Sequence, residues 1–291
     1  MGFFTGFKAN KAWSLQSKGR NEEARKLYEE VYQEGFIAAR PMLAYALLLI
    51  RAGEYTKAQE VLVKTQKAPG ITAEQKSQLF MDYAVCCFKL NDLDRGVRLL
   101  ERQHAKAPTG LTYGALGYLY VEQYDLAHKQ ARIDAILAKA AAKAEAEPAE
   151  PTEPTEATEA DAPAGETEPE QPAAPAIDPE QEWQDGLQKV LLFNKEAVDY
   201  DDEDPICLDN LAQTYYRCFG DKETARPLFE KAHEIKPGQI DTLWFLSRYD
   251  LEEGNTAAAI EKLEDALEGR FSPLNFTDRA MVEAEIARLK A

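Results

Sequence analysis

A 34-residue spacing between short glycine-centred segments is the feature that most constrains this chain. Gly19 and Gly53 lie 34 residues apart, and Gly220 and Gly254 repeat this spacing in the second half. Each of these glycines is followed five residues later by an alanine. A fixed period of this length, combined with helical patterning, indicates stacked helix–turn–helix units. Glycine suits the turns because it readily adopts the left-handed conformation that ends a helix. We therefore expect an all-α fold.

Each unit combines a small residue with a large residue four positions later in its second helix. These pairs are Ala24 with Tyr28, Ala58 with Leu62, Ala225 with Phe229, and Ala259 with Leu263. A third unit has Gly96 at the small position, and a fourth opens with Leu116-Gly117-Tyr118-Leu119-Tyr120. This pattern resembles the tetratricopeptide-repeat (TPR) family over residues 5–125 and 185–270, in about six degenerate repeats. The resemblance implies an α-solenoid of antiparallel helix pairs.

A last helix is expected from Thr277 to Lys290, with Thr277 as its N-cap. Its apolar side would consist of Ala280, Val282, Ile286 and Leu289. The end unit of a solenoid needs such a capping helix because its apolar face would otherwise meet water.

The repeats are interrupted by an acidic segment. Residues 144–182 hold thirteen Asp and Glu and no Lys or Arg, which accounts for most of the net charge of −17. Residues 148–179 hold eight of the fifteen prolines. This composition predicts a disordered linker, because it buries too little apolar surface to offset the entropy of ordering. We place the linker at 144–178, TPR repeats 1–4 at 1–143, the end of repeat 4 with repeats 5 and 6 at 179–270, and the capping helix at 271–291.

Helices are expected on both sides of the linker, at 127–147 and 178–200. Only one second helix should separate the first helix at 111–122 from the first helix at 206–219. We therefore predict that roughly residues 130–188 interrupt the second helix of the fourth repeat, so that one stack continues across them. The alternative is two three-repeat domains joined by a tether.

The family resemblance implies a partner-binding groove on the concave face, lined by the first helices. The matching positions are Trp13, Leu43, Leu47, Met81, Val85, Tyr118, Asn210, Thr214, Arg217, Trp244 and Arg248. The first six are apolar or aromatic, and packing between repeats explains several of them equally well. Arg217 and Arg248 suit an acidic peptide or a free carboxylate, since guanidinium groups match carboxylate geometry. The linker's own glutamates are a second candidate for this arginine patch.

The composition argues against several other functions. An acidic chain without a basic stripe repels nucleic acid. The sequence contains no apolar stretch long enough to span a membrane and no basic, apolar leader, so we expect a cytoplasmic protein. The four cysteines form no CxxC pair, and no phosphate loop, HExxH or GxSxG motif occurs. We therefore expect no metal, no cofactor and no catalysis.

Three functions remain in order of preference. The first is a scaffold or adaptor that binds a protein or peptide. The second is a self-associating structural protein in which repeat ends stack between copies, and the third is an enzyme of unknown chemistry on a helical scaffold. A mass that does not change with concentration would favour the adaptor over self-association.

Overall fold

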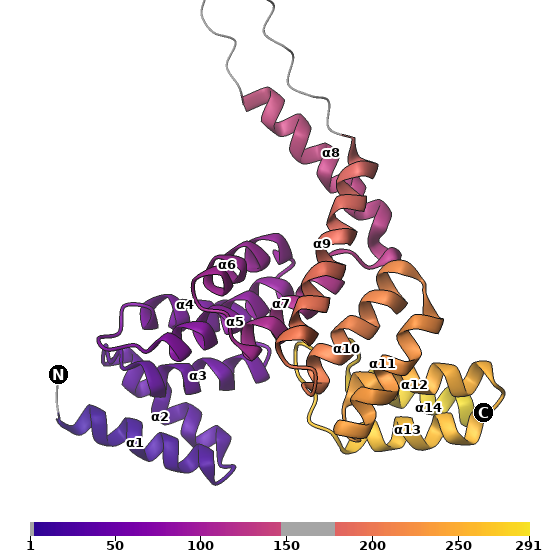
Figure 1. Cartoon of the computed structure of the whole chain (residues 1–291). Helices are drawn as coiled ribbons and strands as arrows, with labels where there is room; N and C mark the ends of the chain where they lie inside the picture. Colours follow the sequence, from indigo (N-terminus) through magenta and orange to yellow (C-terminus); the bar gives the residue numbers. More distant parts are fainter. Residues whose placement is uncertain (1–2, 147–177) are drawn as a thin grey trace, which may run out of the picture.

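The computed structural model describes residues 3–146 and 178–291 of the chain (Figure 1). Most of the expected linker, residues 147–177, lies outside the described residues. Every regular element in the described ranges is helical, as the sequence predicts. The elements are α1 (Phe3–Ser17), α2 (Asn21–Gln33), α3 (Ala39–Arg51), α4 (Tyr55–Thr65), α5 (Ala73–Lys89), α6 (Leu93–Lys106), α7 (Gly110–Gln123), the 3₁₀ turn η1 (Leu126–His128), α8 (Lys129–Ala146), α9 (Pro179–Tyr200), α10 (Pro205–Gln213), the π-helical turn η2 (Thr214–Phe219), α11 (Lys222–Ile235), α12 (Ile240–Glu252), α13 (Thr256–Glu268) and α14 (Arg279–Lys290).

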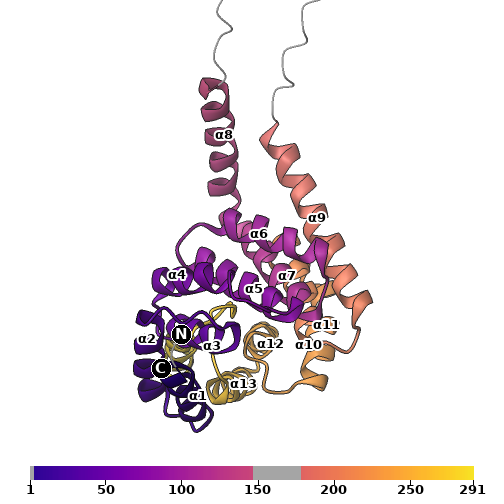
Figure 2. The ribbon, with the colours of Figure 1, turned by 90° about the vertical axis from the view of Figure 1, so that its left-hand side faces the viewer.

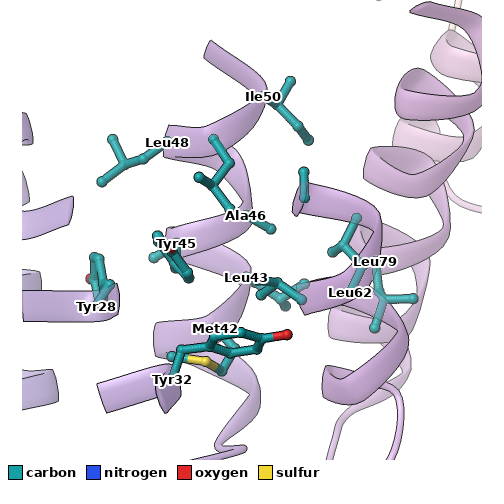
Figure 3. Close-up of a cluster of buried hydrophobic side chains, with 14 of the residues drawn as sticks. Tyr28, Tyr32, Met42, Leu43, Tyr45, Ala46, Leu48, Ile50, Leu62 and Leu79 are labelled. Carbon is teal, nitrogen blue, oxygen red and sulfur yellow. The ribbon is translucent and has the colours of Figure 1, made fainter. Parts of the chain in front are cut away.

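The small and large residues of the repeat pattern form the core between paired helices. Ala24 and Tyr28 are completely buried, as are their counterparts in α4, α11 and α13. In α6 the glycine is required, because a Cβ atom at Gly96 would lie 2.9 Å from the carbonyl oxygen of Ala84. Figure 3 shows Tyr28, Met42, Tyr45 and Leu62 in the cluster that joins the first helix pairs. The expected pairing is thus confirmed.

The fourth pair consists of α7 and α9. The Asn194 side chain on α9 donates to the Gly117 carbonyl oxygen on α7, at 3.4 Å. Helix α7 also contacts α10, where the Asn210 side chain donates to the Gly114 carbonyl oxygen of α7 at 2.8 Å. Gly117 allows this close approach on both sides, since a Cβ there would lie 2.2 Å from Asn194 Oδ1 and 3.0 Å from Asn210 Nδ2. Helices on the two sides of residues 147–177 therefore pack directly on one another, which supports our proposal of one interrupted stack.

Helix α8 begins at Lys129, close to the expected start of the interruption, whereas α9 begins before its expected end. Helix α9 is continuous from Pro179, so it starts before residue 188, and Asp178 caps it by accepting from Glu180 N at 3.0 Å. Figures 1 and 2 show α8 and the first half of α9 extending together from the stack. Trp183 on α9 is buried, with its ring centre 5.4 Å from that of Tyr124 and 5.9 Å from the Lys129 ammonium of α8. The insertion is therefore a projecting helix pair whose second member, α9, re-enters the stack.

The C-terminal helix is shorter than expected. Its N-cap is Asp278, which accepts from Met281 N at 2.8 Å, and Thr277 is buried in other contacts. Val282 and Ile286 are buried against α13, while Ala280 is exposed. The helix thus covers the end of the stack. Its N-cap is Asp278 and not Thr277, and Ala280 does not belong to its buried side.

Candidate functional site

The first helices of the pairs form the concave side of the stack. Helix α1 contacts α3, α3 contacts α5, α5 contacts α7, and α7 contacts α10. Because these helices approach one another more closely than the second helices do, the stack curves around them. The residues that we expected in a binding groove lie on these helices.

The connection between α13 and α14 crosses this concave face. We call residues 269–278 the crossing segment. Tyr118 on α7 donates its hydroxyl to the carbonyl oxygen of Asn275, at 3.1 Å. Leu274 packs against two hydrophobic clusters formed by the first four helix pairs. A segment that follows the sixth pair therefore covers part of the face shared by the earlier ones.

Asp241 on α12 anchors the crossing segment. The residue is 4% exposed. Its carboxylate accepts from Phe276 N at 2.9 Å, from the Asn275 side-chain amide at 3.1 Å, and from both the backbone N–H and the hydroxyl of Thr277 at 3.3 Å. Burial raises the pKa of Asp241, while these donors oppose the shift. The hydrogen bonds explain why Thr277 does not cap the following helix.

Arg217 lies inside the protein, which corrects its expected role as a free groove cation. Its guanidinium donates to Asp125 at 2.8 Å, to Glu122 at 2.7 Å and to Gln213 at 2.8 Å. It also lies 4.2 Å from the centre of the Phe276 ring. The residue is only 6% exposed. Each guanidinium nitrogen therefore has a partner from the chain itself, and the buried group is already paired with two carboxylates.

Arg248 and Trp244 also have partners within the chain. The guanidinium of Arg248 donates to Glu285 of α14 at 2.5 Å and lies 4.2 Å over the Trp244 ring. Trp244 packs, half-buried, against the clusters of the last two pairs. The two arginines thus hold separate parts of the fold together and do not form one patch.

Several other expected groove residues are also used for packing. Val85 is 4% exposed, and Thr214 is fully buried. Asn210 is buried between α10 and α7, where its amide holds the Gly114 carbonyl oxygen. For Val85 and Thr214, the packing explanation replaces the expected contact with a partner.

The remaining candidates line two open depressions on the concave face. The first hollow encloses about 460 Å³, and its lining includes Trp13, Leu43, Leu47, Gln78, Asp82 and Leu111. The second hollow encloses about 410 Å³, and its lining includes Met81, Leu111, Tyr118, Ile206, Asn210 and Leu274. Leu111 lies between them and is 40% exposed. The two hollows therefore border one another at Leu111.

The first hollow keeps large apolar side chains in contact with solvent. Trp13 is 41% exposed, and the Arg40 guanidinium lies 4.3 Å over its ring. Leu47 is half-buried on the neighbouring helix α3. No part of the crossing segment lines this hollow among the described residues. The N-terminal part of the concave face is thus the part that the chain leaves open.

A buried carboxylate lies in the first hollow. Asp82 on α5 is 2% exposed and accepts one hydrogen bond, from Gln78 at 2.8 Å. Burial raises the pKa of Asp82 to about 7, against the opposing effects of Gln78 and the positive charge of Arg51. Asp82 is not among the residues expected from the sequence, although its spacing from Leu79 and Cys86 puts it on the same buried face of the helix.

The variant Asp82→Asn is expected to reduce the pH dependence of stability. An aspartate in an unfolded chain titrates near about 3.9, so the folded chain binds the proton more tightly. The stability that this proton contributes is present below pH about 4 and is lost as the pH rises through about 7. Urea unfolding at pH 5 and pH 8 measures the effect. The stability lost between these pH values should be smaller in the variant by about 2 kcal/mol; equal losses in both chains would contradict the assignment.

The described residues contain no arrangement typical of metal or thiol chemistry. No group of three His, Cys, Asp or Glu is placed to hold a metal ion in the described ranges. All four cysteines are buried and free, and burial raises the pKa of Cys86, Cys207 and Cys218 to about 12. These thiols remain protonated, so they are poor nucleophiles.

None of the described helices is both long and apolar enough to span a bilayer.

Comparisons with known proteins decide the fold. No protein-family model and no curated protein matches the chain. Among solved structures it is similar to TTC0263, a thermophilic TPR protein in Thermus thermophilus, with 14% identity and a TM-score of 0.56 over 87% of this chain and 99% of that one. It is also similar to PilW, a widely conserved type IV pilus biogenesis factor, with 13% identity and a TM-score of 0.54 over 94% and 98% of the two chains. The chain has the tetratricopeptide-repeat fold.

The crossing segment is the part of this TPR fold that the repeat pattern does not predict. Residues 271–276 read Phe-Ser-Pro-Leu-Asn-Phe, so three large apolar residues lie in a stretch without helical periodicity. The apolar side chains of such a stretch need apolar surface elsewhere in the protein to pack against, and here the concave face provides it. That composition is the signal that would have drawn attention to the segment.

Proposed function

We propose that this TPR protein is a non-catalytic scaffold that takes a segment of a protein partner into the first hollow. The observation that carries the proposal is the exposed Trp13 within a concave, largely apolar depression. Tryptophan is enriched among the residues that dominate binding energy, and exposed apolar concavities are typical of interaction sites. The partner's segment would reach as far as Leu111, at the border of the second hollow.

The crossing segment limits where a partner binds in this proposal. It covers the apolar surface around Phe245 and Tyr118, so the C-terminal first helices contribute little free surface. Of the expected groove residues, Trp13, Leu43 and Leu47 are therefore the proposed contacts. The buried free thiols suit a reducing compartment, and we keep a cytoplasmic location as part of the proposal.

Replacing Leu47 with lysine is expected to weaken the binding of peptides selected for the natural protein. A charged group in the centre of the first hollow leaves a partner's apolar side chain without its contact. Peptides are selected from a displayed random library against the natural chain, and their affinities are measured by the change in tryptophan fluorescence. We expect affinity to fall at least about tenfold.

Leu192→Lys is the matched control for that experiment. Leu192 is 66% exposed on α9, outside both hollows, so the same change there should leave affinity unchanged. Peptides that bind the natural and the Leu47→Lys chains equally would disprove the proposed site. A mass that rises with protein concentration and is unaffected by Leu47→Lys would instead favour self-association.

A further inference from the structure

The hydrogen bonding of Asp82 in the first hollow is incomplete. Its Oδ1 accepts from the Gln78 amide at 2.8 Å, whereas its buried Oδ2 has no partner among the described residues. Asp82 is also the most deeply buried of the residues that line the hollow. Buried polar atoms in folded proteins nearly always have a partner, so an unpaired carboxylate oxygen beside an open cavity requires an explanation.

No internal cation supplies the missing partner. In the described ranges no basic nitrogen lies within ion-pairing distance of Asp82, although the charge of Arg51 acts on it from farther away. Asp82 caps no helix, since it lies in the middle of α5. An unpaired ionised carboxylate at such a site costs free energy, and a cationic group entering the hollow would remove that cost.

The walls of the hollow suit the stem of a long basic side chain. Lysine and arginine carry an apolar chain that packs along apolar surface while the charged head reaches a polar group. Leu43 and Leu47 offer such a surface beside Asp82, and Trp13 offers an aromatic edge. Glu74 adds a second carboxylate to the lining, and Arg40, the one basic residue that lines the hollow in the described part of the chain, is already stacked on the Trp13 ring. The lining thus has an excess of negative charge.

We infer that the first hollow binds a lysine or arginine side chain of a protein partner, with the stem along Leu43 and Leu47 and the cationic head on Asp82. This inference rests on the proposed function and adds the chemistry of the partner. It replaces the acidic partner expected from Arg217 and Arg248, whose guanidinium groups have carboxylate partners within the chain.

Parallel peptide selections test the inference. The same displayed random library is selected against the natural chain, the Asp82→Asn and Leu47→Lys variants, and the control Asp250→Asn. Asp250 pairs with Lys262 at 2.6 Å, outside both hollows, so its variant removes one carboxylate without changing the site. Circular dichroism melts confirm that each variant is folded. A second measurement needs no variant: each selected peptide is resynthesised with norleucine in place of its basic residue.

We expect lysine or arginine to be enriched at one peptide position for the natural and Asp250→Asn chains, and not for Asp82→Asn. The norleucine peptide should bind the natural chain about 30-fold more weakly. Suppose that the selected peptides need Leu47 for binding, but that selection against Asp82→Asn enriches the same residues as selection against the natural chain. That result would overturn the inference and leave the proposed function standing. Enrichment of acidic residues would also overturn it. Failure to select any peptide that depends on Leu47 would refute both.

Discussion

Replacing Arg217 with alanine is expected to lower the free energy of unfolding by about 3–5 kcal/mol. The side chain is buried and pairs with both Glu122 and Asp125, each itself largely buried. Its removal leaves two carboxylates without a counterion inside the protein, and such groups cost more than the lost attraction alone. It also removes the contact with the Phe276 ring. Urea unfolding followed by circular dichroism measures the loss.

Arg226→Ala is the control for this variant. Arg226 also makes two ion pairs, with Glu230 and Glu253, but its side chain is 42% exposed. Exposed pairs contribute about 0–1 kcal/mol, so the control should remain close to the natural chain. Adding Glu122→Gln and Asp125→Asn to Arg217→Ala should restore part of the stability, because the buried charges are then gone. An Arg217 variant as stable as the Arg226 variant would contradict the structural role and return Arg217 to the candidate binding residues.

Phe276→Ala is expected to release the crossing segment from the concave face. The Phe276 ring lies 5.2 Å from the Phe245 ring and is covered by the Arg217 guanidinium. Truncating a half-buried phenylalanine of this kind should cost about 2–4 kcal/mol. Because the neighbouring Asn275 carbonyl oxygen binds Tyr118, the loss should extend to α7. Hydrogen exchange should therefore become faster both in residues 275–277 and around Tyr118.

Phe271→Ala provides the comparison within the same segment. Phe271 packs against the cluster of the last helix pair and α14, and not against the earlier pairs. We expect this variant to lose stability without faster exchange around Tyr118. If both variants change exchange only within the C-terminal pair, then the crossing segment does not connect the two halves of the stack.

The regular part of this fold could be predicted because it depends on local patterns. The four glycines that define the 34-residue period adopt positive φ angles, between 68° and 81°, at the turns within the helix pairs. The alanines that follow them are buried where two helices meet. Periodicity fixes which face of each helix is buried, so the order of helix pairs follows from the sequence alone. The position of α9 also followed, because a stack of pairs needs one second helix at that point.

The candidate site could be predicted only in part. Trp13, Leu43 and Leu47 do line an open hollow, because their positions on first helices fix the side of the stack that they face. The use of Arg217 inside the fold could not be foreseen, since its partners Glu122 and Asp125 are 95 and 92 residues away in the chain. The crossing segment decides which groove positions remain exposed. Its path depends on tertiary contacts, and no repeat in the sequence predicts those contacts.

Hydrogen exchange of the natural chain, with and without a selected peptide, tests most directly whether the N-terminal part of the concave face is the binding site. Our account predicts slower exchange in the stretches of α1, α3 and α5 that contain Trp13, Leu47 and Asp82, and unchanged exchange in residues 275–277. Slower exchange in α10 and α12, together with faster exchange in residues 275–277, would contradict it. That result would mean that the partner displaces the crossing segment and binds the C-terminal half.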